Sequence, residues 1–231
     1  MLAGKYLNRF IDERLNPEIG IDADALEHFS HDDFKAVAKK LSERKLEVTI
    51  HGPFLDLSPG SPDPLVRQVT RRRYEQVLGL LPVFRPKTLV CHAGYDRSRY
   101  GFASDLWLGY SLEMWRWLAE KAGDEGTRLM LENVFERGPG EMKDLFENLQ
   151  DHHVGFCFDI GHQASFSRTS FQKWMAVLGT RVEQLHLHDN NGGTDDHRGL
   201  GFGDIDFKAF FTLLKTYRDT PPVITLEPHY E

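Results

Sequence analysis

The chain has 231 residues, of which 40% are hydrophobic and 27% charged, and its formal net charge is -7. This composition is that of an ordinary folded protein, and the length fits a single domain over residues 1–231, in the size range of a β/α barrel. The negative charge argues against a broad nucleic-acid surface, and the lack of a membrane-length apolar run or a signal peptide predicts a cytoplasmic protein with no membrane partner.

Short apolar runs alternate with longer stretches of helical period along the chain. Each run has the length and content of a buried parallel strand. The runs cover residues 17–22, 46–51, 88–92, 128–132, 154–159, 182–186 and 223–227. The helical stretches cover residues 4–15, 31–45, 62–82, 104–122, 140–151, 168–179 and 206–218. This order predicts an α/β fold, a TIM-type (β/α) barrel of parallel strands with outer helices.

The start of the chain does not supply a complete barrel. A strand and a helix should precede Pro17, where only sixteen residues are available. Residues 4–15 can form the helix, but Met1-Leu2-Ala3 is too short for a good strand. We therefore expect the first strand to be missing or vestigial, so that the barrel is incomplete or the natural chain begins upstream of Met1.

The strand-like runs end on residues that can bind metals. In a barrel of parallel strands the carboxyl ends lie at one face, so residues far apart in sequence converge there. Packing alone does not explain so many acidic and imidazole groups at equivalent positions. The six clearest strand-end residues are His51, His92, Glu132, Asp159, His186 and Glu227.

The two cysteines, Cys91 and Cys157, both lie inside predicted strands. Because side chains alternate along a strand, Cys157 shares the inward face with Asp159, whereas Cys91 faces away from the side of His92. This placement predicts buried thiols and no disulfide framework.

An ordered set of short motifs lies at these strand ends. The motifs are His51-Gly52-Pro53-Phe54, Leu131-Glu132-Asn133, Asp159-Ile160-Gly161-His162, His186-Leu187-His188-Asp189, residues 195–203 (DDHRGLGFG) and Leu226-Glu227-Pro228. From about residue 17 to its end, the chain resembles the xylose-isomerase-like barrel superfamily, which includes endonuclease IV and many sugar and sugar-phosphate isomerases and epimerases.

The resemblance implies a divalent-metal site. The metal set shared across the superfamily corresponds to Glu132, Asp159, His186 and Glu227. The endonuclease IV branch holds a trinuclear zinc cluster, and its additional ligands correspond to His51, His92, His162, Asp195 and His197. His188 stands where that branch typically has Asn. Mixed carboxylate and imidazole ligands suit Zn²⁺ or Mn²⁺, and the sequence does not choose between them.

The resemblance leaves two enzyme classes open. The first is a sugar or sugar-phosphate isomerase or epimerase with one metal that stabilises an ene-diolate. In this class Glu132 and Glu227 would move the proton beside the carbonyl. His162 and Arg198 would orient substrate oxygens or stabilise the developing charge. The substrate would be a small sugar or sugar phosphate.

The alternative is an endonuclease IV-like phosphoester hydrolase with two or three metals, which the full set of nine ligand types favours. The acidic balance and the lack of evident DNA-contacting loops argue against it. A metal-binding barrel without activity is a third reading, although an open mouth lined with acid/base groups is unusual for a structural site. On balance the sequence favours the single-metal isomerase or epimerase.

Overall fold

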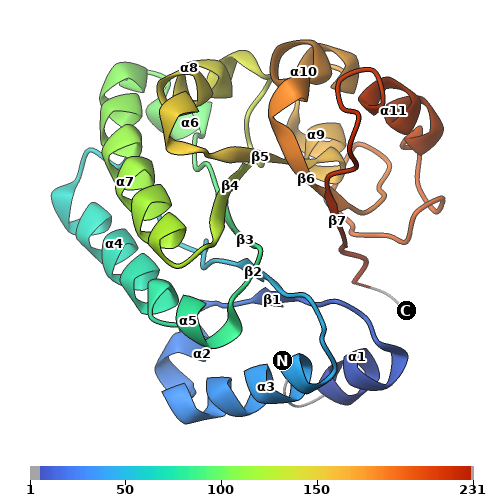
Figure 1. Ribbon diagram of the computed structural model, residues 1–231. Helices are drawn as coiled ribbons and strands as arrows, with labels where there is room; N and C mark the ends of the chain where they lie inside the picture. Colours follow the sequence, from blue (N-terminus) through green and yellow to red (C-terminus); the bar gives the residue numbers. More distant parts are fainter. Residues whose placement is uncertain (1–5, 230–231) are drawn as a thin grey trace.

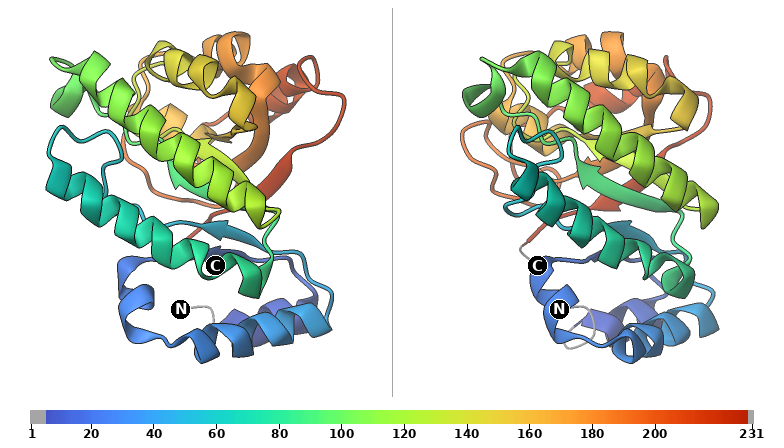
Figure 2. Two further views of the ribbon diagram at one scale, coloured as in Figure 1. Left: turned by 60° about the vertical axis from the view of Figure 1, so that its left-hand side comes forward. Right: turned by 90° about the vertical axis from the view of Figure 1, so that its left-hand side faces the viewer.

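The computed structural model describes residues 6–229 and contains one parallel sheet whose seven strands are neighbours in chain order. The strands are β1 (Glu18–Gly20), β2 (Thr49–His51), β3 (Thr88–His92), β4 (Arg128–Glu132), β5 (Gly155–Asp159), β6 (Val182–Leu187) and β7 (Val223–Leu226). The sheet curves into a nearly closed barrel with the helices outside it (Figures 1 and 2). The predicted TIM-type fold is confirmed.

Helices connect successive strands and cover the outside of the barrel. They are α1 (Leu7–Glu13), α2 (Ala23–His28), α3 (His31–Glu43), α4 (Pro64–Leu78), α5 (Leu81–Phe84), α6 (Arg97–Tyr100), α7 (Ser104–Asp124), α8 (Gly140–Asn148), α9 (Ile160–Phe166), α10 (Phe171–Leu178) and α11 (Phe207–Leu214), with short 3-10 turns η2 (Gln150–His152) and η3 (Gly179–Arg181). The long helices match the predicted stretches, whereas α2, α6 and α9 were not predicted.

Local capping explains where several helices begin. Ser30 and Asp33 form a reciprocal capping box at the start of α3. Asp22 follows β1 and accepts the backbone N–H of Ala25, so it caps α2. The strand predicted over residues 17–22 is therefore shorter than expected, because β1 ends at Gly20 and the exposed Asp22 begins a helix and does not end a strand.

The barrel has a seam between its first and last strands. Within residues 6–229 there is no eighth strand, and Met1-Leu2-Ala3 lies outside the described residues. A side-chain hydrogen bond spans the seam, where the Thr225 hydroxyl donates to Glu18 Oε2 at 3.3 Å. No helix in the described part of the chain is both long and apolar enough to cross a membrane.

Side-chain alternation divides the buried residues into two sets. Cys91 packs in the large core between the strands and the outer helices. Val90, Met130 and Cys157 form a separate buried cluster on neighbouring strands, facing the barrel interior as the period of two requires. Both thiols are buried and free, as predicted.

Candidate metal centre

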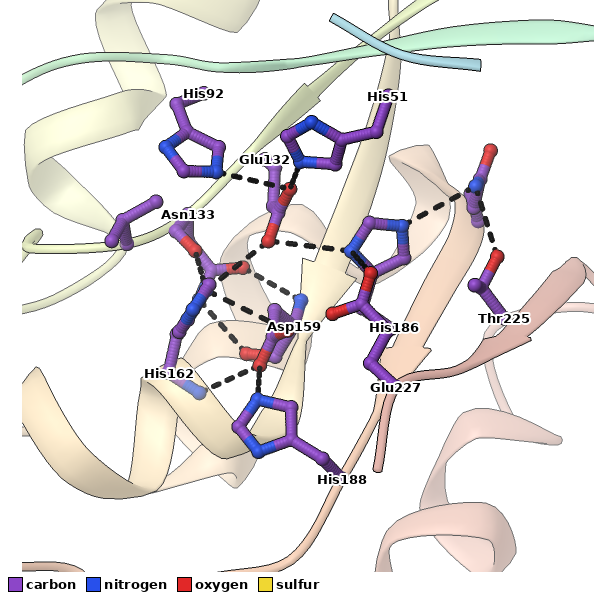
Figure 3. A network of polar contacts seen from close by, with 12 residues as sticks. His51, His92, Glu132, Asn133, Asp159, His162, His186, His188, Thr225 and Glu227 are labelled. Carbon is purple, nitrogen blue, oxygen red and sulfur yellow. Dashed lines mark hydrogen bonds and ion pairs between the residues drawn. The ribbon is translucent and has the colours of Figure 1, made fainter. Parts of the chain in front are cut away.

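The strand ends bring their polar side chains together at the mouth of the barrel. His51, His92, Glu132 and Asp159 are the last residues of β2, β3, β4 and β5. His186 lies one residue before the end of β6, and Glu227 directly follows β7. Figure 3 shows these six side chains pointing toward one another from their separate strands. A shared face of parallel strand ends thus places all six predicted residues in one cluster.

His162 reaches the cluster from helix α9, which starts directly after β5. Asp159 is both the last strand residue and the N-cap of α9, where its Oδ1 accepts the backbone N–H of His162 at 2.6 Å. One turn of helix therefore places the His162 ring over the strand ends. The side chain is 9% exposed.

Asp195 and His197 come from the loop between β6 and α11. The buried Asp189 carboxylate holds this loop by accepting the backbone N–H groups of Asn190, Gly201 and Ile205. His197 itself has a φ of 48°, a left-handed conformation uncommon for a residue other than glycine. The loop is thus folded around Asp189 in the way that turns its ligand-type residues inward.

The two carboxylate oxygens of Glu132 face different histidines. Oε2 lies 3.1 Å from His51 Nε2 and 3.7 Å from His92 Nε2. Oε1 lies 3.1 Å from His162 Nδ1 and 3.4 Å from His186 Nδ1. Glu132 is buried, with 1% of its side chain exposed. It therefore stands as a buried carboxylate at the centre of four imidazoles, and each of its two oxygens faces a different pair of histidines (Figure 3).

Asp195 forms the centre of a second group. Its Oδ2 lies 3.3 Å from His162 Nε2 and 3.2 Å from His197 Nε2. Its Oδ1 is buried and accepts no hydrogen bond from the described residues. Potential ligand atoms of His162, His188, Asp195 and His197 all lie within 4.8 Å of one another.

Three histidines are fixed in one protonation pattern by the backbone. Nδ1 of His51, His162 and His197 lies 2.8, 3.0 and 2.8 Å from the carbonyl oxygens of Gly52, Asn133 and Glu227. Because a carbonyl oxygen only accepts, each Nδ1 carries the proton and donates it. Nε2 of each ring then faces a carboxylate. A backbone carbonyl behind the ring is the usual support of a metal-binding histidine.

The buried charges strongly affect one another. Burial favours the neutral form of Glu132, but His186 and His92 outweigh it and hold the pKa of this carboxyl well below its usual range. Burial alone would lower the pKa of His162 and His186, yet neighbouring acidic groups raise both pKa values well above normal. For His92 burial dominates and lowers the pKa to about 3.

The donor set fits one or more divalent cations. Asp159 Oδ2 and His186 Nδ1 are buried without a hydrogen-bond partner among the described residues, and such atoms are costly unless something binds them. Further groups with metal-ligand spacing are His51, His92 and Glu132, and Glu132, Asp159 and His162. Carboxylates with imidazoles suit Zn²⁺ or Mn²⁺. All nine predicted ligand residues lie in this connected cluster.

Arg198, a predicted catalytic residue, is engaged within its own loop. Its guanidinium donates to Asp196 Oδ2 at 2.6 Å and to Asn191 Oδ1 at 3.0 Å. Its backbone pairs with Asp189 in an isolated β-bridge. In this conformation Arg198 supports the loop that carries Asp195 and His197.

Two residues of the cluster were not predicted as functional. The buried His188 has Nε2 3.2 Å from Asp159 Oδ1, and its ring stacks on His197 with centroids 3.7 Å apart. Glu18 opens β1, and its Oε1 lies 2.8 Å from His186 Nε2. Burial opposes ionisation of Glu18, but the ion pair with His186 prevails and lowers the pKa to about 2. A charged residue inside a buried strand run was the available signal for Glu18.

The mouth opens into a cavity of about 1570 Å³ that continues along the seam. Phe54 stands at its edge, 45% exposed, with its ring stacked on His92 at a centroid distance of 4.4 Å. Phe135, 53% exposed, and the buried Glu136 also line it. The cavity has room for a small polar substrate beside the cluster.

The fold and the strand-end site define a known class of barrel. The model of the family described as xylose isomerase-like TIM barrel matches residues 17–231. The chain therefore belongs to this family.

Individual relatives show how far the similarity extends. The TTHB071 protein of Thermus thermophilus, in a structure soaked with ZnCl2, is 30% identical with a TM-score of 0.82 over 99% of this chain and 88% of that one. The uncharacterized protein MJ1311 of Methanocaldococcus jannaschii is 26% identical over 202 residues, 81% of this chain and 67% of MJ1311. A D-tagatose 3-epimerase-like protein is 24% identical with a TM-score of 0.75, over 90% of this chain and 80% of that protein, which shows the fold alone.

Proposed function

We propose that the chain is a metal-dependent phosphoester hydrolase with a centre of two or three divalent cations, acting on a small sugar phosphate or a similar phosphoester. One observation carries the proposal: the two oxygens of Glu132 face separate histidine groups, with His51 Nε2 on one side and His186 Nδ1 on the other. A carboxylate held in this way suits a ligand shared between two cations.

The fixed protonation of the histidines supports the same reading. In a single-metal site the additional histidines would serve as hydrogen-bond donors to the substrate. His51 and His197, however, donate from Nδ1 to backbone carbonyls and turn Nε2 toward Glu132 and Asp195. Burial lowers the pKa of both histidines, but the facing carboxylates outweigh it and raise both pKa values. In the metal-free protein a proton on Nε2 would therefore join each ring to its carboxylate, and a cation bound between the two atoms would replace that proton.

Within this centre His51 and His92 would bind with Glu132, and His162 and His197 with Asp195. The metal set shared across the superfamily, Glu132, Asp159, His186 and Glu227, would hold a further cation. Bound cations would supply positive charge for the phosphoryl oxygens and lower the pKa of an attacking water. Glu227, 22% exposed and lining the cavity, would accept the proton from that water.

The mouth suits a small substrate. Phe54 stacks on His92 at this side of the cluster, where its ring would help to exclude water from a bound substrate. A soaked zinc salt in the TTHB071 structure, at 30% identity, supports Zn²⁺ as the metal. Zn²⁺ and Mn²⁺ remain the two candidate ions.

A sugar epimerase or isomerase is the second candidate, which the sequence favoured. Glu132 and Glu227 lie 3.4 and 3.1 Å from the same nitrogen, His186 Nδ1, and come from opposite strands β4 and β7. Two carboxylates around one position can remove a proton from one face of a carbon and return it to the other. The fold shared with the D-tagatose 3-epimerase-like protein supports this candidate.

Two assays on zinc-loaded protein separate the candidates. Hydrolysis of p-nitrophenyl phosphate or bis(p-nitrophenyl) phosphate, lost in Glu227→Gln and on chelation, is the expected result. Incorporation of solvent deuterium into D-tagatose without phosphoester hydrolysis would contradict the hydrolase and support the epimerase. Exposed Glu125→Gln is the matched control, and it should leave either activity unchanged.

A further inference from the structure

The carboxylate of Glu18 lies in the barrel interior beneath the strand-end cluster. Glu18 is the first residue of β1, and its side chain is 6% exposed. Its Oε2 accepts three hydrogen bonds, from Thr49 Oγ1 at 2.8 Å, Gln184 Nε2 at 2.6 Å and Thr225 Oγ1 at 3.3 Å. Donors on β2, β6 and β7 therefore fix the position of this carboxylate.

The other oxygen of Glu18, Oε1, forms an ion pair with a buried histidine. Oε1 lies 2.8 Å from Nε2 of His186, a residue that is 0% exposed. The opposite ring nitrogen, Nδ1, lies 3.1 Å from Glu227 and 3.4 Å from Glu132. The His186 imidazole thus stands between Glu18 below and the strand-end carboxylates above.

A buried charge at this place needs a reason. Other strands place apolar side chains such as Val90 and Met130 inside the barrel, and an ionised carboxylate is costly to bury unless it is paired. A carboxylate behind a metal-binding imidazole fixes the ring orientation and makes the facing nitrogen a stronger donor. That role accounts for both the charge and its position.

We propose that Glu18 is a positioning residue of the metal centre, which holds His186 with Nε2 protonated and Nδ1 as the metal-binding nitrogen. The inference rests on the proposed metal centre. It adds a residue to the nine predicted metal ligands, in a supporting role, and it assigns the nitrogen through which His186 binds the metal.

Two variants separate the charge of Glu18 from its structural hydrogen bonds. Glu18→Gln keeps the shape and removes the charge. Thr49→Val, the matched control, removes one hydrogen bond to Oε2 and leaves the charge in place. If Glu18 only stabilised its hydrogen-bond donors on the neighbouring strands, both variants would lower the stability of the metal-free protein. The two variants would then bind zinc with the same affinity.

The test is the zinc affinity of full-length metal-free protein, measured by competition with a chelator, together with its thermal unfolding. We expect Glu18→Gln to weaken the tightest zinc site by about tenfold or more, and Thr49→Val to weaken it by less than about threefold. Equal zinc affinity of Glu18→Gln and wild type, or an equal loss in both variants, would overturn the proposal.

A measurement on the wild type keeps the proposal testable if Glu18→Gln does not fold. Two-bond ¹H–¹⁵N correlation spectra of the zinc-loaded protein should show His186 protonated at Nε2 and bound through Nδ1. Binding through Nε2 would overturn the role of Glu18 alone. A wild type that binds no zinc would instead defeat the proposed function itself, so the two failures are distinguishable.

Discussion

Glu132 and Asp195 lie on opposite sides of one imidazole. Glu132 Oε1 is 3.1 Å from His162 Nδ1, and Asp195 Oδ2 is 3.3 Å from His162 Nε2. His162 therefore connects the inner group around Glu132 to the outer group around Asp195. Its own position depends on Asp159, which caps the helix that carries it.

The position of His162 predicts the effect of removing its ring. His162→Asn should reduce the zinc bound at saturation by about one ion per chain, because the outer group loses one of its imidazoles. Elemental analysis of the dialysed protein gives the count. His28→Asn, at an exposed position in α2, is the control and should bind as much zinc as the wild type. Equal zinc in His162→Asn and wild type would exclude His162 as a ligand.

The buried Glu136 predicts a pH-dependent stability. Burial, only partly offset by hydrogen bonds such as that from the Val134 N–H, raises the pKa of Glu136 from 4.5 to about 7. Between these pH values the folded state holds a proton that the unfolded state has lost. The contribution of Glu136 to stability is therefore present below about pH 4.5 and lost as the pH rises through about 7.

Glu136→Gln removes this dependence. As the pH rises from 4 to 8, the unfolding free energy of the variant should increase relative to that of the wild type by up to about 3 kcal/mol. Urea unfolding of the metal-free proteins at several pH values measures the difference. A constant difference across this range would show that Glu136 titrates alike in the folded and unfolded chain.

Gly161 predicts a steric limit beside the site. A Cβ at Gly161 would lie 2.0 Å from Cε1 of the buried His188 ring, which also contacts Asp159. Gly161→Ala should therefore destabilise the protein by about 1–3 kcal/mol. Gly109→Ala in helix α7 is the matched control, because a Cβ there meets no atom within 4 Å. This control should be neutral or stabilising by up to about 1 kcal/mol. Equal thermal stability of Gly161→Ala and wild type would refute the clash.

The charge of the chain predicts poor activity on duplex DNA. Affinity for a duplex comes largely from phosphate contacts, whereas this chain carries a net charge of -7. We expect no specific incision of an oligonucleotide duplex with an abasic site, even with Zn²⁺ or Mn²⁺ supplied. Denaturing gels measure the product. Metal-dependent incision that disappears in Glu132→Ala would identify DNA as a substrate.

The strand ends were the most predictable part of the site. Parallel strands present their carboxyl ends at one face whatever the loops do, so the sequence order of His51, Glu132 and Glu227 was enough to predict that they converge. The sequence did not predict that His162 lies on a helix, because Asp159 ends a strand and caps a helix at the same time. Hydrophobic periodicity does not distinguish these two roles.

The rest of the site depends on contacts that a sequence does not encode locally. The role of Glu18 requires Gln184 and His186, which lie far away in the chain and meet it only when the barrel curves. The orientation of Arg198 is decided by its loop, where the nearby Asp196 binds the guanidinium. Loop conformation and long-range pairing are set by the whole fold, which periodicity does not describe.

The number of metal ions per chain tests the central claim most directly. Metal-free protein should be reconstituted with excess Zn²⁺, dialysed, and examined by elemental analysis and native mass spectrometry. Glu132 faces two groups of histidines, and Asp195 faces a third group. This arrangement predicts about two to three zinc ions per chain. Saturation at about one zinc ion per chain would contradict the shared centre and favour a single-metal epimerase.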